Sequence, residues 1–295
     1  MGEDRWLQRS LRTASSGDRG ARRLAWSLWL LTVGLLALGG WLEALNAPAR
    51  GSPWQQSLGL VPLSLPFATV GVLIASRHRD NPIGWLLVGL GLVVAVVLGG
   101  HQYSRYALVT APGSLPAGDW AAWLTVWPVE LTVLLLTLML LLFPDGHPLS
   151  PRWRPVVWLT VSLGAVSAAT EALSAVNFVD NVPFAQHPTQ LLDAGTARTV
   201  YQASTSVLLG LLVAAAWSLA VRLRRARGTQ RQQLKWFAYV GGLGVVALLA
   251  WGFVSPDTVI VTLVWFPALA AAIGIAIFRY RLYDIDHIIN RTLSY

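Results

Sequence analysis

IGWLLVGLGLVVAVVLGG, from Ile83 to Gly100, contains no charged residue and no proline. A helix rises about 1.5 Å per residue, so this stretch alone reaches about 27 Å, close to the hydrocarbon thickness of about 30 Å. It therefore predicts a transmembrane helix.

The composition of the whole chain is also strongly apolar. Apolar residues make up 55% of the 295 positions, charged residues make up only 12%, and the mean hydropathy is +0.54. An ordinary soluble domain carries about 25% charged residues. The composition therefore excludes an ordinary soluble protein and predicts an all-α, polytopic membrane bundle.

Eight apolar runs are long enough to cross a bilayer, which predicts a membrane bundle of eight helices over residues 24–278. Pro62 and Pro66 interrupt the second run, where neighbouring helices would have to tolerate a kink. The runs are Leu24–Leu42, Ser57–Ala75, Ile83–Gly100, Ala121–Phe143, Val156–Ala175, Val200–Val221, Trp236–Val254 and Thr258–Phe278.

Glycines recur within these runs. Gly84, Gly89 and Gly91, and the GGLG stretch at residues 241–244, are typical of close helix packing in membranes. A substrate path lined by these glycines is the alternative interpretation.

Basic residues are distributed unevenly over the loops. With the N-terminus inside, nineteen of the 22 Lys and Arg residues fall in cytoplasmic segments, and only Arg50, Arg105 and Arg198 fall outside. The positive-inside rule therefore predicts that both termini are cytoplasmic. This topology accounts for the net charge of +8, because the bases are dispersed among loops rather than gathered on one nucleic-acid-binding face.

Residues 1–23 are small, polar and basic, which predicts a disordered cytoplasmic tail. Arg22 and Arg23 precede an apolar run as they would in a secretory signal. That run has 19 residues, however, and the apolar region of a signal peptide has about 7–15. We therefore expect the first run to remain as a membrane helix.

Motifs of enzymes and metal sites are missing from the sequence. It has no P-loop, no dinucleotide-binding glycine fingerprint, no HExxH and no G-x-S-x-G. It has no cysteine, and its five histidines lack the spacing of metal ligands. We therefore expect no metal, no cofactor and no catalytic residue.

One acidic residue stands out in the fourth run. Glu130 lies nine residues past Ala121, about 13 Å along a helix, where a carboxylate costs several kcal/mol unless it is paired, protonated or hydrated. By spacing, Trp123 and Trp127 share its helical face, and Pro128 predicts a kink beside them. These three side chains, Glu130, Trp123 and Trp127, are candidates for a pocket that senses a cationic or lipid-like ligand.

A simpler interpretation of the same residues stays open. Trp120, Trp123 and Trp127 would then form an interfacial aromatic belt, and the span would begin near Trp127. Glu130 would lie only one turn inside the membrane and would extend toward water.

Other charged residues near the predicted outer surface are few. Glu171 ends the fifth run, and His101 and Arg105 follow the third; they would either join Glu130 or reach water separately. A proton-coupled transporter usually has more acids at mid-depth and an internal inverted repeat, and neither is evident in the sequence.

The loop VRLRRARGTQRQQLKWF, from Val221 to Phe237, has six basic residues and no acidic one. Each base near anionic headgroups contributes about 1 kcal/mol, so we expect this loop to lie on the inner leaflet. Docking of a partner protein is the alternative. The expected lipid contacts are Arg222, Arg224, Arg225, Arg227, Arg231 and Lys235.

Four segments together resemble the N-terminal membrane region of certain bacterial sensor histidine kinases and their uncharacterised relatives. They are RHRDNPIGWLL (77–87), LFPDGHPLSPRWRPV (142–156), RRARGTQRQQLKWFAYV (224–240) and AIGIAIFRYRLYDIDHIINRTLSY (272–295). The likeness leaves the first 50 residues uncovered. It implies a signal-input role in the bacterial cytoplasmic membrane and does not transfer kinase activity, because the sequence has no phosphoacceptor or ATP-binding motifs.

The segment 279–295 has apolar residues at a three, four, four spacing, which is typical of an amphipathic helix on a membrane surface. By the resemblance, it is a cytoplasmic connector to an output domain missing from this chain, or to a separate signalling partner. A simple interfacial helix that follows the last span is the alternative. The candidate relay residues are Arg279, Tyr280, Arg281, Tyr283, Asp284 and Asp286.

We therefore expect a signal-input or scaffold module that is not itself an enzyme and that works by a shift in helix packing. The alternative is a transporter of small molecules or lipids that uses Glu130. The expected partners are the bilayer, the anionic lipids of its inner leaflet and a cytoplasmic signalling protein, without nucleic acid. The sequence leaves a homodimer open.

Overall fold

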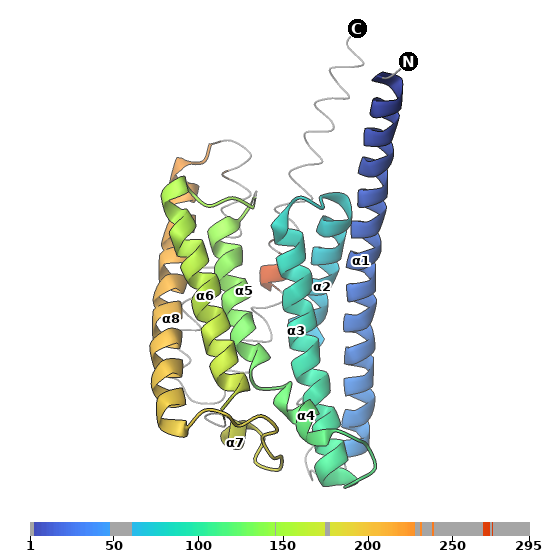
Figure 1. The fold of residues 1–295 in the computed structure, drawn as a ribbon, viewed down its shortest axis with the longest axis vertical. Helices are drawn as coiled ribbons and strands as arrows, with labels where there is room; N and C mark the ends of the chain where they lie inside the picture. The colour runs from blue at the N-terminus through green and yellow to red at the C-terminus, as the bar shows by residue number, and fades with distance from the viewer. Residues whose placement is uncertain are drawn as a thin grey trace.

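A computed structural model describes residues 3–47, 61–144, 146–174 and 178–227, together with positions 231, 238, 268–271 and 273 (Figure 1). The described part of the chain is helical and contains no strand. Its elements are α1 (Glu3–Asn46), α2 (Val61–Arg77), α3 (Pro82–Arg105), the π-helical turn η3 (Tyr106–Thr110), α4 (Gly118–Trp123), α5 (Pro128–Leu142), the short helix η4 (Pro151–Trp153), α6 (Arg154–Ala172), α7 (Phe178–Asn181) and α8 (Ala194–Arg225).

The long helices form two groups that meet in the middle of the molecule. Helices α1, α2 and α3 pack together, α5, α6 and α8 pack together, and α3 against α5 joins the groups (Figure 1). We call the end that carries α4 and α7 the lower end, and the end that carries the α2–α3 and α5–α6 turns the upper end, as Figure 1 draws them.

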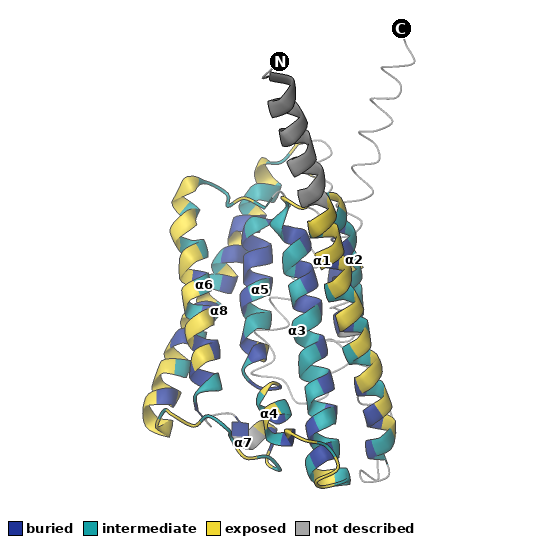
Figure 2. Cartoon of the chain, turned by 45° about the vertical axis from the view of Figure 1, so that its right-hand side comes forward, coloured by how far each residue is buried: buried dark blue, intermediate teal, exposed yellow. Residues whose placement is uncertain are grey.

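Buried and exposed residues follow this arrangement. Buried positions lie along α3 and α5 in the middle, whereas the outward faces of α1, α6 and α8 are exposed (Figure 2). The exposed positions include large apolar side chains such as Trp158 of α6, 71% exposed, and Trp217 of α8, 62% exposed. Such outward apolar faces suit a lipid environment, where they need no protein cover.

Five of the predicted spans are confirmed as helices long and apolar enough to cross a membrane, so the chain is a multi-pass membrane protein. They are Arg19–Asn46, Pro82–Thr110, Gly118–Leu142, Pro151–Ala172 and Ala194–Arg225. The second predicted span corresponds to the shorter α2, which contains Pro66. The seventh and eighth predicted spans lie almost entirely outside the described residues, so the count of eight stays a prediction.

The N-terminal residues differ from the expected disordered tail. The backbone is helical from Glu3 and continues without a break into the first span as α1. The physical reason is that the region contains several strong helix formers (Leu, Arg, Gln and Ala) and no proline. Because the first span is already helical, extending it backward requires no new nucleation.

Helices α2 and α3 approach each other at glycines. A Cβ on Gly84 would lie 2.6 Å from the backbone nitrogen of Ala75, and one on Gly91 would lie 2.8 Å from that of Ala68. The close approach lets the Ser64 hydroxyl donate to the Gly91 carbonyl at 2.7 Å. The predicted packing role is therefore confirmed for these two glycines, as small residues permit in membranes.

Gly89 has a different environment. A Cβ there would meet only the Leu135 Cδ1 atom, at 3.8 Å, which is an ordinary van der Waals contact. The glycines at 241–244 lie outside the described residues.

Candidate functional site

Glu130 lies in the first turn of α5. The fourth predicted span is not one continuous helix, because α4 ends at Trp123 and residues 124–127 form a turn. Pro128 then starts α5 at its first position, where a missing N–H is tolerated. The span therefore bends beside Glu130, as Pro128 predicted, and the acidic side chain lies at the positive end of the α5 dipole.

The Glu130 side chain does not extend toward water. It is only 8% exposed, and its carboxylate accepts a hydrogen bond from the Tyr201 hydroxyl of α8 at 3.0 Å. A buried carboxylate without a donor would carry a large desolvation cost, and this bond offsets part of it.

A second carboxyl group is buried at the same end of the bundle. Glu171 of α6 is 3% exposed, and both Glu130 and Glu171 are close enough to Tyr201 to act on its phenol electrostatically. The sequence left open whether Glu171 joins Glu130 or reaches water, and the structure buries it near Tyr201, the hydrogen-bond partner of Glu130.

Hydroxyl groups extend this polar interior along α6 and α8. The Ser167 hydroxyl donates to Ser204 at 2.8 Å and lies 3.5 Å from the Thr205 hydroxyl. We call the whole set the carboxyl cluster: Glu130, Glu171, Tyr201, Ser167, Ser204 and Thr205. It lies where α5, α6 and α8 meet, in the half of the bundle toward the lower end.

The tryptophans contact the protein rather than form an open aromatic pocket in the described residues. The Trp123 indole nitrogen donates to the Ala172 carbonyl at the end of α6, at 2.8 Å. The Trp123 ring lies 5.4 Å from that of Trp127 and 5.7 Å from that of Trp120. Trp123 thus ties α4 to α6 next to Glu171, while its role as a ligand sensor stays a prediction.

The upper end is held by an arginine of α8. The Arg222 guanidinium donates to the carbonyls of Phe143 at 2.8 Å, Leu141 at 2.5 Å and His147 at 2.8 Å. The last carbonyls of a helix have no partner within it, and Arg222 satisfies those at the end of α5. We call this set of bonds the Arg222 latch.

The latch adjoins the α2–α3 turn. Asn81 caps α3 by accepting from the Ile83 N–H at 3.0 Å, and its amide donates across to the Pro144 carbonyl at 3.4 Å. Gly146 has a φ of +79°, and any side chain there would collide with the Pro82 ring. The two turns and the end of α8 therefore form one connected unit.

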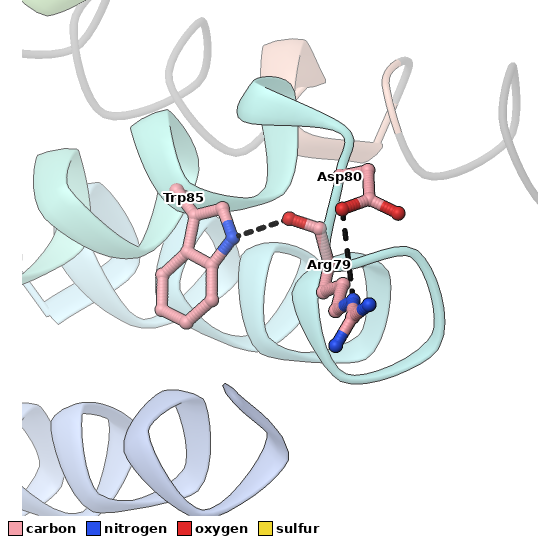
Figure 3. Close-up of polar contacts among 3 residues, drawn as sticks. All are labelled: Arg79, Asp80 and Trp85. Atoms are coloured by element: carbon pink, nitrogen blue, oxygen red, sulfur yellow. Dashed lines mark hydrogen bonds and ion pairs between the residues drawn. The ribbon is translucent and has the colours of Figure 1, made fainter. Parts of the chain in front are cut away.

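Figure 3 shows the neighbouring residues of the α2–α3 turn. The Trp85 indole donates to the Arg79 carbonyl at 2.9 Å, and the Arg79 guanidinium lies 3.6 Å from the Asp80 carboxylate. The Asp80 side chain is 94% exposed, so this ion pair contributes little, whereas the indole bond fixes the turn against the start of α3.

Comparisons with family models, curated proteins and solved structures give no match to this chain. Function must therefore be argued from the site itself. Within the described ranges, no three His, Asp or Glu side chains gather in a way that would hold a metal ion.

The predicted lipid-binding arginines separate into two groups. Arg222 has protein partners in the latch, which its spacing in a basic loop did not indicate. Arg224, Arg225, Arg227 and Arg231 are exposed at or beyond the end of α8, and lipid contact stays a prediction for them. Lys235 and the relay candidates of residues 279–295 lie outside the described residues.

The sequence did not single out Tyr201. It is the second residue of the sixth predicted run, on the same membrane side as Glu130, so topology alone placed the two residues at one end. Which face of α8 turns toward α5 could not be derived, because α8 has polar and apolar residues on every side.

Proposed function

We propose that this chain is a membrane-embedded signal-input module in which α8 relays changes at the carboxyl cluster to the upper end. The observation that carries the proposal is that one uninterrupted helix, Ala194–Arg225, holds both Tyr201 and Arg222. These residues are 21 positions apart, about 31 Å along a helix. A rotation or shift of α8 would therefore act on both sites at once.

The chemistry at each end suits such a relay. Gain or loss of a proton at Glu130 changes the strength of its bond to Tyr201, because bonds to a charged acceptor are the stronger ones. At the other end, the planar fork of Arg222 fits its carbonyls in one position of α8. Packed helices tend to adopt discrete arrangements, so a small change at one end can be passed to the other.

The upper end carries two of the segments on which the resemblance to sensor kinases rests, and its basic residues favour a cytoplasmic location. The turns 77–87 and 142–156 belong to the resembling segments, and α8 leads directly into the third. Described arginines at this end include Arg77, Arg79, Arg152, Arg154, Arg222, Arg224, Arg225 and Arg227, against Arg105 and Arg198 at the lower end. This asymmetry favours a cytoplasmic upper end.

The relay can be tested by distance measurements in a chain that has no native cysteine. Spin labels on Ser150→Cys and Arg225→Cys report the separation of the α5–α6 turn from the end of α8, by pulsed electron resonance in nanodiscs. We expect Tyr201→Phe and Glu130→Gln to change the distance distribution. Gln202→Ala, at the exposed neighbouring position, is the matched control. Unchanged distributions in both cluster variants would overturn the relay.

A transporter is the second candidate, favoured by the two carboxyl groups buried within membrane-spanning helices. Proteoliposomes with an entrapped pH dye, given an external acid pulse, distinguish the two functions. A transporter that moves protons through the cluster should lose its flux on Glu130→Gln. A signal-input module should show no flux above that of protein-free vesicles.

A further inference from the structure

A short segment packs against α4 and the end of α6, next to the carboxyl cluster. We call residues 178–192, which comprise α7 and the chain after it, the cap. Phe178 and Val182 of the cap form a buried apolar cluster with Ala122 of α4 and with Val126. The cap therefore lies on the α4–α5 junction, immediately before Glu130.

Hydrogen bonds attach the other end of the cap to α6. The Thr189 hydroxyl donates to the Ala172 carbonyl at 2.7 Å, and the N–H groups of Leu191 and Leu192 donate to the Leu173 carbonyl at 2.9 and 3.0 Å. Ala172 follows Glu171 in the chain. Its carbonyl also accepts from Trp123, so the cap and α4 both donate a hydrogen bond to the same carbonyl oxygen.

His187 sits at the centre of these attachments. Its ring packs edge-on against Phe178 at 4.8 Å, and its Nδ1 accepts a hydrogen bond from the Thr189 N–H at 3.2 Å. An imidazole nitrogen that accepts carries no proton, so the bond requires neutral His187 with its proton on Nε2. Protonation of Nδ1 would place its N–H opposite the Thr189 N–H, and two donors cannot form a hydrogen bond.

We infer that the cap is a closed cover over the carboxyl cluster and that protonation of His187 opens it. Loss of the Thr189 N–H bond removes the local turn that positions the Thr189 hydroxyl on Ala172. A charged ring is also unfavourable against Phe178 and the apolar cluster beneath it. The inference rests on the proposed function for its meaning, since it names acidity at the lower end as the stimulus.

The pKa of His187 is shifted in the direction that this inference requires. Burial lowers the pKa of His187, and the nearby backbone of Glu171 and Ser174 offsets only part of the effect. A lowered pKa means that the closed cap favours the neutral ring, so closure is complete above the ordinary pKa of about 6.5 and weakens as pH falls below it.

Other titratable groups also face the cap and must be separated from His187. Asp119 of α4 accepts from the Gln186 N–H at 2.8 Å, His101 of α3 lies 6.2 Å from the Phe184 ring, and Glu171 ends α6 beside the cap. His101 therefore provides the matched control for a histidine in contact with the same segment.

Cysteine accessibility tests the inference directly. Val126→Cys is close to isosteric and places a thiol beneath the cap, while Leu191→Cys places one at an exposed cap position. In nanodiscs, both are treated with a hydrophilic maleimide at about pH 7.5 and about pH 5.5, which bracket the ordinary imidazole pKa. Dividing the Val126→Cys rate by the Leu191→Cys rate removes the pH dependence of the thiol itself.

We expect this ratio to rise several-fold at the lower pH, to lose its pH dependence in His187→Gln and to keep it in His101→Gln. Gln retains an acceptor and cannot take up the proton. A ratio independent of pH, or a rise that persists in His187→Gln, would overturn the inference. Either result would leave the α8 relay standing, because the spin-label distances do not depend on the cap.

Discussion

Arg222 donates to the Leu141 and Phe143 carbonyls at the end of α5 and to the His147 carbonyl in the turn that follows. Hydrogen bonds from charged donors contribute about 1.5–3 kcal/mol each, although bonds of one side chain do not add fully. We therefore expect Arg222→Met to lower the free energy of unfolding by about 2 kcal/mol or more, measured by denaturation in detergent.

Arg224→Met is the control, because Arg224 is exposed two residues away on α8 and its removal should change stability by about 0.5 kcal/mol or less. Arg222→Lys keeps the charge but not the planar fork, so it should recover only part of the loss. Equal stability of Arg222→Met and Arg224→Met would mean that the latch contributes nothing.

Asp193 gives a pH-dependent prediction at the start of α8. Its carboxylate accepts from the Thr196 N–H at 2.8 Å, and this capping holds the pKa of Asp193 below its usual value. A carboxyl group with a lowered pKa in the folded state stabilises above its unfolded pKa, about 3.9, and that stability is lost as pH falls through the folded pKa.

The measurement is the melting temperature of wild type minus that of Asp193→Asn at about pH 6 and about pH 3. Asn still caps the helix but does not titrate, and the other carboxyl groups cancel in the difference. We expect the wild-type advantage to shrink at the lower pH. A difference that stays constant or grows would contradict the assigned cap.

Among the elements, the α2–α3 contact depends on two glycines and not on a third. Gly91→Ala should destabilise the protein by about 1–3 kcal/mol, because a methyl group would press on the Ala68 backbone of α2. Gly89→Ala should be neutral or stabilising by up to about 1 kcal/mol, since its Cβ has room and alanine favours a helix. Thermal denaturation of the pair measures the difference, and equal melting temperatures would refute the close approach.

The elements also show what the sequence could and could not predict. Runs without charge, such as 83–100, predicted α3 reliably because only a membrane span explains them. The fourth run concealed a break at 124–127, since a span of this length gives no sign of where its helix ends except Pro128. The prediction that Trp123, Trp127 and Glu130 share one face assumed a continuous helix. Because the helix is interrupted after Trp123, its indole donates to the Ala172 carbonyl instead.

For a related reason, the sequence could not predict which side chains contact each other between helices. Apolar residues surround a membrane helix on all sides, so periodicity does not reveal which face is buried. Glu130 was found because charge is rare in such runs, but its partner Tyr201 resembles any interfacial tyrosine. Arg222 likewise looked like one base among six, and only the packing of α8 against α5 distinguishes it.

For the whole molecule, the two ends should lie on opposite sides of the membrane. We expect Ser114→Cys, at the lower end, to react with an impermeant maleimide in intact cells, and Ser150→Cys, in the α5–α6 turn, to react only after the cells are opened. Native cysteines do not interfere, as the chain has none. Reaction of Ser150→Cys from outside would reverse the predicted orientation.

The latch has a consequence for how the protein is made. Arg222 and the Leu141 carbonyl that it binds are 81 residues apart in the chain. At a synthesis rate of about 5–20 residues per second, the α5–α6 turn leaves the ribosome about 4–16 seconds before its arginine. During that interval the nascent chain exposes uncapped carbonyls at the insertion machinery. The Arg222 latch therefore forms only after translation has delivered the end of α8.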